Sequence, residues 1–199
     1  DLVSEYKKIL PYFDIPVQHA DEEVLRAMRR SGSGEKYGEL FQKIREKNPD
    51  AVIRTTLMLG FPGEDRAAFE KLLEFVKNAE PDWMGSFTYS REEDTPAYSM
   101  RNQKDHDKAQ RVAKKWQKEL EAVQSPITEK HLERFVGKTY RALVEEKIEG
   151  EDLAIGRIYS QAPDVDGLTV IMGRDMKPGN TVMVGIRAVR GVDLEGVKI

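Results

Sequence analysis

The sequence has 199 residues, 39% hydrophobic and 34% charged, a composition typical of a folded globular protein rather than a disordered one. Its 32 Lys and Arg against 35 Asp and Glu give a formal charge of −3, so no general attraction to nucleic acid is expected. Cysteine is absent, which excludes disulfides and thiolate catalysis. No signal-peptide pattern or run of roughly 20 apolar residues is present, so we expect a cytoplasmic protein with no membrane partner.

Residues 1–102 alternate strand-like and helix-like patterns, which is typical of βα units that build a parallel sheet. Three strands are predicted, at residues 12–18, 51–59 and 82–90, and the second of them is expected to be buried on both faces. Helices are predicted from the N-cap Asp21 to Arg29–Arg30, over the apolar stripe Tyr37, Leu40, Phe41 and Ile44, and from Glu64 onward. Trp83 and Phe87 are expected in the core. The opening residues lead into a strand with little before it, so we expect the chain to be part of a larger fold.

The pattern changes twice after residue 102. Residues 103–133 are highly charged with sparse apolar positions, which predicts a long linking helix, with an interruption possible at Ser125–Pro126. Residues 134–199 then show five short strands separated by Gly, Pro and Asp turns, at 139–144, 153–159, 168–172, 181–186 and 192–197. This spacing predicts a small closed all-β barrel. The expected domains are therefore 1–102, 103–133 and 134–199.

Ligands of parallel βα folds bind where the strands end, and this rule selects three segments of the chain. The first is Gln18–Ala20, the second Gly60–Glu64 and the third Tyr89–Pro96. Gly60 and Gly63 can adopt positive φ and let a flat ligand approach the backbone, with Glu64 opening the next helix. The simpler interpretations are a tight strand-to-helix turn for the second segment and a solvated acidic turn for the third.

Two polar side chains near these segments suit a zwitterionic ligand. The Gln18 amide both donates and accepts hydrogen bonds, as a ribose or an amino-acid group requires, and Arg30 can hold a carboxylate. Gln18 could equally satisfy backbone groups of its own loop, and Arg30 could be a solvated cation near a helix end. His19 is adjacent, but a single histidine is more often structural, so no catalytic residue and no metal ligand is assigned.

Five sequence blocks, taken in order, resemble the methylthiotransferase branch of the radical S-adenosylmethionine (SAM) enzymes. They are DIPVQHAD with VLRAMRR, RTTLMLGFPGE, FTYSREEDTPA, FVGKTYRALVEE and GRIYSQAPDVDG, and they span nearly the whole chain. The resemblance implies the C-terminal half of a partial (β/α) radical SAM barrel followed by a small five-stranded TRAM barrel. It also implies SAM and two [4Fe-4S] clusters in the full-length enzyme. Because the cluster cysteines are absent here, this chain alone is expected to be inactive.

The same resemblance implies where SAM lies. Gln18 and Arg30 match polar positions that contact SAM, the segment Met58, Gly60 and Phe61 matches the strand end against the adenine, and Phe87 matches a position that lines the same pocket. The stretch SGSGEKYG departs from the more helical sequence expected after the paired arginines, so the geometry around Arg30 is the least determined part of the prediction.

The family contains two branches that differ in substrate. One modifies an adenosine of transfer RNA, and the other, the RimO-like branch, adds a methylthio group to the β-carbon of an aspartate in a small-subunit decoding-centre ribosomal protein. From residue 133 onward the chain has ten Lys or Arg and eleven Asp or Glu, without the basic excess of an RNA-binding barrel. The sequence therefore favours the ribosomal-protein substrate. A transfer-RNA enzyme and a non-catalytic RNA-binding module are the alternatives.

Overall fold

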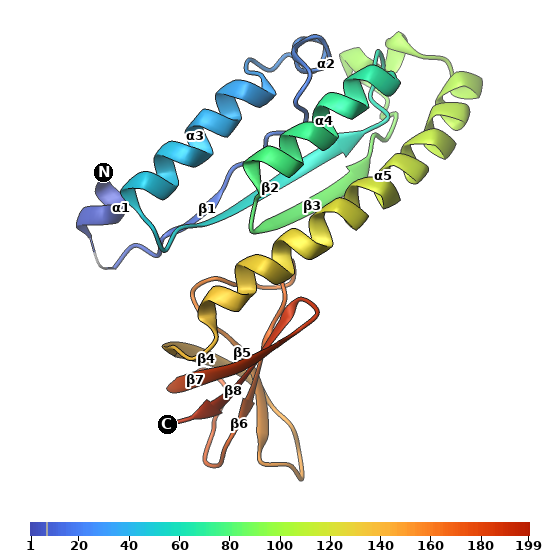
Figure 1. The fold of residues 1–199 in the computed structure, drawn as a ribbon. Coiled ribbons are helices and arrows are strands. Elements are labelled where there is room, and N and C mark those ends of the chain that lie inside the picture. The colour runs from blue at the N-terminus through green and yellow to red at the C-terminus, as the bar shows by residue number, and fades with distance from the viewer. Residues whose placement is uncertain (7) are drawn as a thin grey trace. The chain divides into compact units, whose positions relative to one another are not determined.

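A computed structural model describes residues 1–6 and 8–199, and its chain divides into two compact units (Figure 1). The first contains residues 1–5 and 13–124, and the second residues 6–12 and 125–199. One helix, α5 (Gln103–Leu132), runs through the division and continues past Pro126, so the possible interruption there is not observed. The division falls beside Pro126, which cannot donate a backbone hydrogen bond. The three domains expected from the sequence remain a prediction.

The first unit is built on a three-stranded parallel sheet in the order β1-β2-β3. Its strands are β1 (Tyr12–Asp14), β2 (Val52–Leu59) and β3 (Trp83–Thr88), and its helical segments are α1 (Leu2–Glu5), α2 (Glu22–Ala27), α3 (Gly34–Lys47), α4 (Arg66–Ala79) and the 3₁₀ turn η1 (Pro96–Met100). Figure 1 shows α3 and α4 along one side of the sheet. The parallel α/β architecture expected from the sequence is confirmed.

Burial along β2 alternates between the two faces of the sheet. Ile53, Leu57 and Leu59 are fully buried, whereas Arg54 and Met58 are only partly covered. The expectation of a strand buried on both faces is therefore wrong for the second face. The register pairs Met58 with Phe87, so both side chains lie on the half-buried face, and Phe87 is 40% exposed instead of belonging to the core. Trp83 is buried as expected.

In the first unit, some predicted boundaries are wrong by a few residues. The first strand ends at Asp14, and Gln18 adds only a single parallel bridge to Leu57. Helix α2 ends at Ala27 rather than at the paired arginines, because Arg29 turns into the left-handed region. Helix α4 is N-capped by Asp65, whose carboxylate accepts a hydrogen bond from the Ala68 N–H, and Glu64 precedes the helix.

The second unit is a closed five-stranded barrel, as the turn spacing predicted. Its strands are β4 (Thr139–Lys147), β5 (Leu153–Arg157), β6 (Thr169–Met172), β7 (Thr181–Arg190) and β8 (Asp193–Lys198), in the order β4-β5-β6-β8-β7, after the short 3₁₀ turn η2 (Glu133–Phe135). Apolar side chains such as Val144, Ile171 and Ile186 alternate inward to fill the core. Closure leaves no unpaired strand edge within the barrel.

Candidate functional site

A cavity of about 560 Å³ lies at the C-terminal ends of the sheet strands. One side is formed by Gln18 and by residues 27–30 after α2, the second by Met58 and Phe61 at the end of β2, and the third by residues 95–100 around η1. Its surface is mainly apolar, with an amide and guanidinium groups at one side. A larger groove of about 1000 Å³ separates α3 from α4, but it is lined by helix surface and by none of the predicted site residues. The smaller cavity is therefore the candidate site.

Two residues of this cavity have left-handed backbones that favour glycine. Gln18 has φ of 71°, and both of its backbone polar groups are bonded to β2. Its N–H donates to Thr56 O at 2.9 Å, and its carbonyl accepts from the Met58 N–H at 2.8 Å. Arg29 has φ of 58°. Each such residue costs on the order of 1–2 kcal/mol, and strain of this kind concentrates at ligand sites.

Arg29 closes α2 by a Schellman motif, and this places Arg30 beside the cavity. The N–H of Arg30 donates to Leu25 O at 2.8 Å, which is the six-residue bond of that motif. The Arg30 guanidinium donates to Pro16 O at 2.7 Å and stays exposed. After the turn, Ser33 caps α3 by accepting a hydrogen bond from the Lys36 N–H, so α3 begins at Gly34 within the SGSGEKYG stretch.

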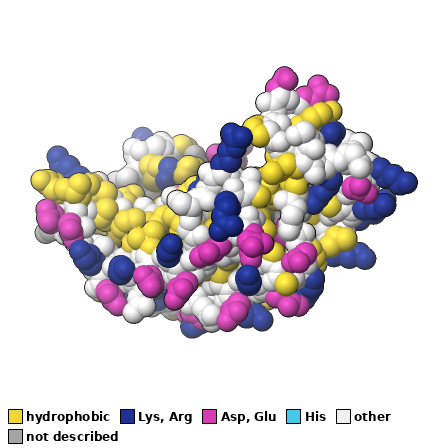
Figure 2. Space-filling model, turned by 90° about the horizontal axis from the view of Figure 1, so that it is seen from above, with side chains coloured by type: hydrophobic (Ala, Val, Ile, Leu, Met, Phe, Trp, Pro, Cys, Tyr) yellow, Lys and Arg dark blue, Asp and Glu magenta, His cyan; other side chains and the backbone are white. Residues whose placement is uncertain are grey.

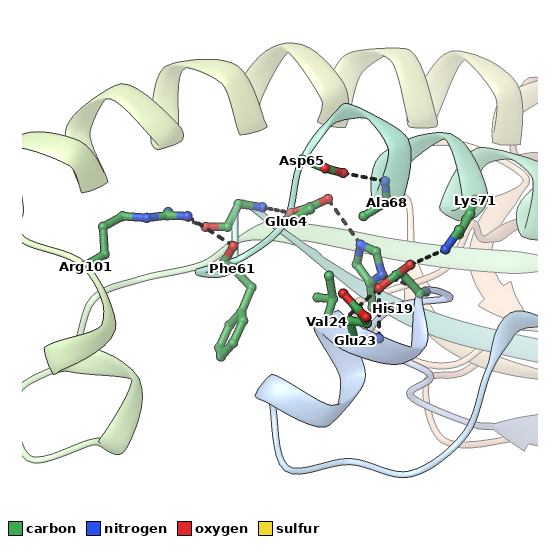
Figure 3. A network of polar contacts seen from close by, with 11 residues as sticks. His19, Glu23, Val24, Phe61, Glu64, Asp65, Ala68, Lys71 and Arg101 are labelled. Atoms are coloured by element: carbon green, nitrogen blue, oxygen red, sulfur yellow. Dashed lines mark hydrogen bonds and ion pairs between the residues drawn. The ribbon is translucent and has the colours of Figure 1, made fainter.

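A buried polar network holds the Gly60–Gly63 turn from the α2 side (Figure 3). The N–H of Asp21 donates to Nδ1 of His19 at 3.0 Å, so the proton of the neutral ring is on Nε2, which lies 3.2 Å from Oε1 of Glu64. The other Glu64 oxygen accepts from the Gly60 N–H. Both side chains of the His19–Glu64 pair are fully buried. Glu64 thus fixes the turn, whereas the sequence predicted it as a helix-start residue.

Asp21 joins this network to α4. Its carboxylate accepts from the N–H groups of Glu23 and Val24, as an N-cap does, and from Nζ of Lys71 at 2.7 Å. Burial alone would raise the pKa of Asp21, but the hydrogen bond from Lys71 and the backbone hydrogen bonds together outweigh it, and the pKa is lowered. The same contact with Asp21 raises the pKa of Lys71.

The sequence reasoning missed the side of the cavity around η1. Arg91 lies over the Tyr98 ring at 3.5 Å from its centroid and donates to the carbonyl groups of Tyr98 and Arg101. Arg101 in turn donates to Gly60 O at 2.8 Å and Phe61 O at 3.2 Å (Figure 3). Only the position of residues 89–96 after a strand end pointed to this region, because contacts to backbone carbonyls leave no periodic signal in a sequence.

The structure brings together four of the six predicted site residues, Gln18, Arg30, Met58 and Phe61, around one cavity. Gly60 precedes Phe61 and does not line the cavity. It has φ of 79°, and its α-carbon packs toward Ala113 of α5. Phe87 shares a sheet face with Met58 but does not line this cavity. The assignment of all six residues to SAM stays a prediction.

Neither a metal cluster nor a membrane span is found in the described parts of the chain. No group of three or more His, Asp or Glu side chains in residues 1–6 and 8–199 is arranged to hold a metal ion. Within the same ranges, no helix is both long and apolar enough to cross a bilayer. Figure 2 shows Lys and Arg interspersed with Asp and Glu on one face of the molecule, without a large region of a single sign.

Comparison with known proteins assigns both parts of the chain. Residues 1–76 match the radical SAM superfamily, and residues 136–199 match the TRAM domain. The chain thus combines a radical SAM region with a TRAM barrel. It is 42% identical over its whole length to the ribosomal protein uS12 methylthiotransferase RimO of Treponema denticola, of which it covers 46%. It is 40% identical to the enzyme of that name from Thermotoga maritima, over 96% of this chain and 43% of the relative. It is 39% identical to the enzyme of that name from Aquifex aeolicus, over 98% of this chain and 45% of the relative.

These similarities extend over both units, since the aligned regions cover 96% to 100% of the chain. The chain is thus similar over both of its units to radical SAM methylthiotransferases. It spans less than half the length of these relatives.

Proposed function

We propose that this chain is the part of a methylthiotransferase that forms one side of the SAM site and engages the protein substrate. The full enzyme would add a methylthio group to the β-carbon of an aspartate in ribosomal protein uS12. This is the protein that appears in the names of the relatives. The observation that carries the proposal is the cavity at the strand ends, where an amide and guanidinium groups adjoin an apolar wall. This combination suits a ligand with a flat adenine at one end and an amino acid at the other.

The residues present fit SAM. Met58 and Phe61 supply apolar surface for the adenine, the Gln18 amide can bond the ribose or amino group, and the Arg30 guanidinium can hold the carboxylate. When bound to a reduced iron–sulfur cluster, SAM supplies the radical that removes a hydrogen atom from the target carbon. What this chain contributes is orientation and exclusion of water, since the left-handed Gln18 and Arg29 are already held in place.

Cluster ligands are not among these 199 residues, because the sequence contains no cysteine. We propose that two [4Fe-4S] clusters are held by other parts of the enzyme and that this chain alone is inactive. A chain purified by itself should then bind no iron and release no 5′-deoxyadenosine when supplied with SAM and a reductant. Either result in the opposite sense would contradict this part of the proposal.

The barrel is the proposed contact for uS12. Residues 134–199 contain ten basic and ten acidic side chains and so have no excess of positive charge, which favours a basic protein over the phosphates of transfer RNA. The test compares full-length enzyme with and without residues 134–199, measuring binding to uS12 and the methylthio group on uS12 by mass spectrometry. We expect binding and modification to be lost together. Unchanged binding, or methylthio groups on transfer RNA in place of uS12, would refute the substrate assignment.

A further inference from the structure

Arg101 joins two sides of the candidate cavity, the turn after β2 and the segment around η1. Its guanidinium donates through Nη1 to the carbonyl of Gly60 at 2.8 Å and through Nη2 to the carbonyl of Phe61 at 3.2 Å. Its own carbonyl accepts from Nε of Arg91 at 2.7 Å. The planar fork of an arginine suits two successive carbonyls, and lysine cannot reproduce this geometry. The end of η1 and the turn after β2 are therefore tied to one another through this side chain.

Phe61 is the cavity residue that these contacts restrain most. Its carbonyl is held by Arg101, and its ring packs edge-on against Tyr89 at a centroid distance of 5.1 Å. The N–H of the preceding Gly60 is held from the opposite side by Glu64 (Figure 3). On the other side of the cavity, Met100 lies next to Arg101 in the chain and lines the cavity from η1. The backbone on both sides is thus held by contacts within the chain.

We propose that Arg101 is a positioning residue that sets the affinity of the enzyme for the adenosyl part of SAM, an inference that rests on the proposed SAM site. It does so without touching the ligand, by holding Phe61 and η1 in place on two sides of the cavity. A binding surface ordered in advance spares the ligand the entropy cost of ordering it. Loss of Arg101 should free both surfaces at once and weaken every ligand that carries the adenosyl group.

A purely structural role for Arg101 predicts a different result. If it only anchored the start of α5, its loss would lower the melting temperature and leave ligand affinity unchanged. If it acted on the amino-acid end of SAM, S-adenosylhomocysteine would be weakened but 5′-methylthioadenosine, which lacks that end, would not. The comparison of these two ligands therefore isolates the adenosyl side.

The experiment is calorimetric titration of the full-length enzyme with S-adenosylhomocysteine and with 5′-methylthioadenosine. Arg101→Gln should weaken both ligands by the same factor, about ten-fold, equivalent to about 1.4 kcal/mol. Arg101→Lys keeps the charge without the fork and should be weakened to a similar extent. Arg111→Gln removes the same charge from an exposed position of α5 and should match the wild type. Amide hydrogen exchange of residues 97–100 should become faster in both Arg101 variants.

Each outcome decides the question. Unchanged affinity for both ligands, with or without a lower melting temperature, overturns the inference, and so does a loss confined to S-adenosylhomocysteine. Should Arg101→Gln fail to fold, Arg101→Lys carries the same comparison. A wild-type enzyme that binds neither ligand overturns the SAM site itself, and the inference with it, so that failure of the proposed function is recognised before any variant is measured.

Discussion

Gly60 and Gly63 flank the turn at the candidate site, and an added methyl group at each would meet different surroundings. Both have positive φ, 79° and 97°. A Cβ at Gly60 would lie 2.8 Å from the Cβ of Ala113, whereas a Cβ at Gly63 would have no neighbour within 4 Å. Carbon atoms in contact prefer about 3.5–4.0 Å, so only the change at Gly60 creates an overlap. Comparing alanine substitutions at Gly60 and Gly63 therefore separates the cost of backbone strain from the cost of packing against α5.

The expected costs follow from these two contributions. Gly63→Ala should lower the free energy of unfolding by about 1–2 kcal/mol, the cost of a left-handed backbone for a residue with a side chain. Gly60→Ala adds overpacking of about 1–3 kcal/mol against the fully buried Ala113 and should therefore cost about 2–5 kcal/mol. Ala113→Gly removes the overlapping atom, so it should cost less in the Gly60→Ala protein than the ~1 kcal/mol it costs alone.

Urea unfolding of the wild type and the four variants, followed by circular dichroism, measures these differences. The wild type, Gly60→Ala, Ala113→Gly and their combination form a double-mutant cycle. A favourable coupling between Gly60→Ala and Ala113→Gly of about 1 kcal/mol or more is expected. Equal costs for the two glycine substitutions, together with strict additivity at Gly60 and Ala113, would refute the close packing of the turn on α5.

Two further predictions concern the network near α2 and the barrel. Because the pKa of Asp21 is lowered in the folded state, its contribution is complete above the unfolded value near 3.8 and is lost as the pH falls through the folded value. Asp21→Asn keeps the cap and should reduce the loss of unfolding free energy below about pH 4. Asp21→Ala should in addition lower the unfolding free energy by about 0.5–2 kcal/mol at neutral pH. The same loss of unfolding free energy below about pH 4 in Asp21→Asn as in the wild type would contradict this. In the barrel, the buried Gln161 accepts hydrogen bonds from the Ile158 N–H and the Thr169 hydroxyl. Gln161→Ala should therefore cost about 1–3 kcal/mol in thermal unfolding, and a neutral effect would show that these groups find other partners.

Much of the fold was predictable because burial imposes a period on the sequence. The apolar positions of β2 and α4 and the turn spacing of the barrel follow from residues that must face a core. The exposure of Phe87 was not predictable, since an aromatic residue in a predicted strand is expected in the core whichever face of the sheet it occupies. The sequence also could not show which of two adjacent carboxylates caps α4. Asp65 is the cap, whereas Glu64 bonds to His19, a partner 45 residues away.

The candidate site shows the same limit. Gln18 and Arg30 were identified because they follow predicted strand and helix ends, and the structure places both at the cavity. The left-handed backbones of Gln18 and Arg29 could not be anticipated, because neither is a residue type that usually adopts them. The contact of Arg101 with two carbonyls of the Gly60 turn depends on where η1 ends, which only the folded chain determines.

The central claim is that the cavity at the strand ends holds SAM. Hydrogen exchange of the full-length enzyme, measured with and without saturating S-adenosylhomocysteine, tests it most directly. We predict slower exchange in residues 27–30, 58–61 and 95–100, the three segments that surround the cavity. Unchanged exchange in all three segments despite measured binding, or protection confined to the barrel, would contradict the account.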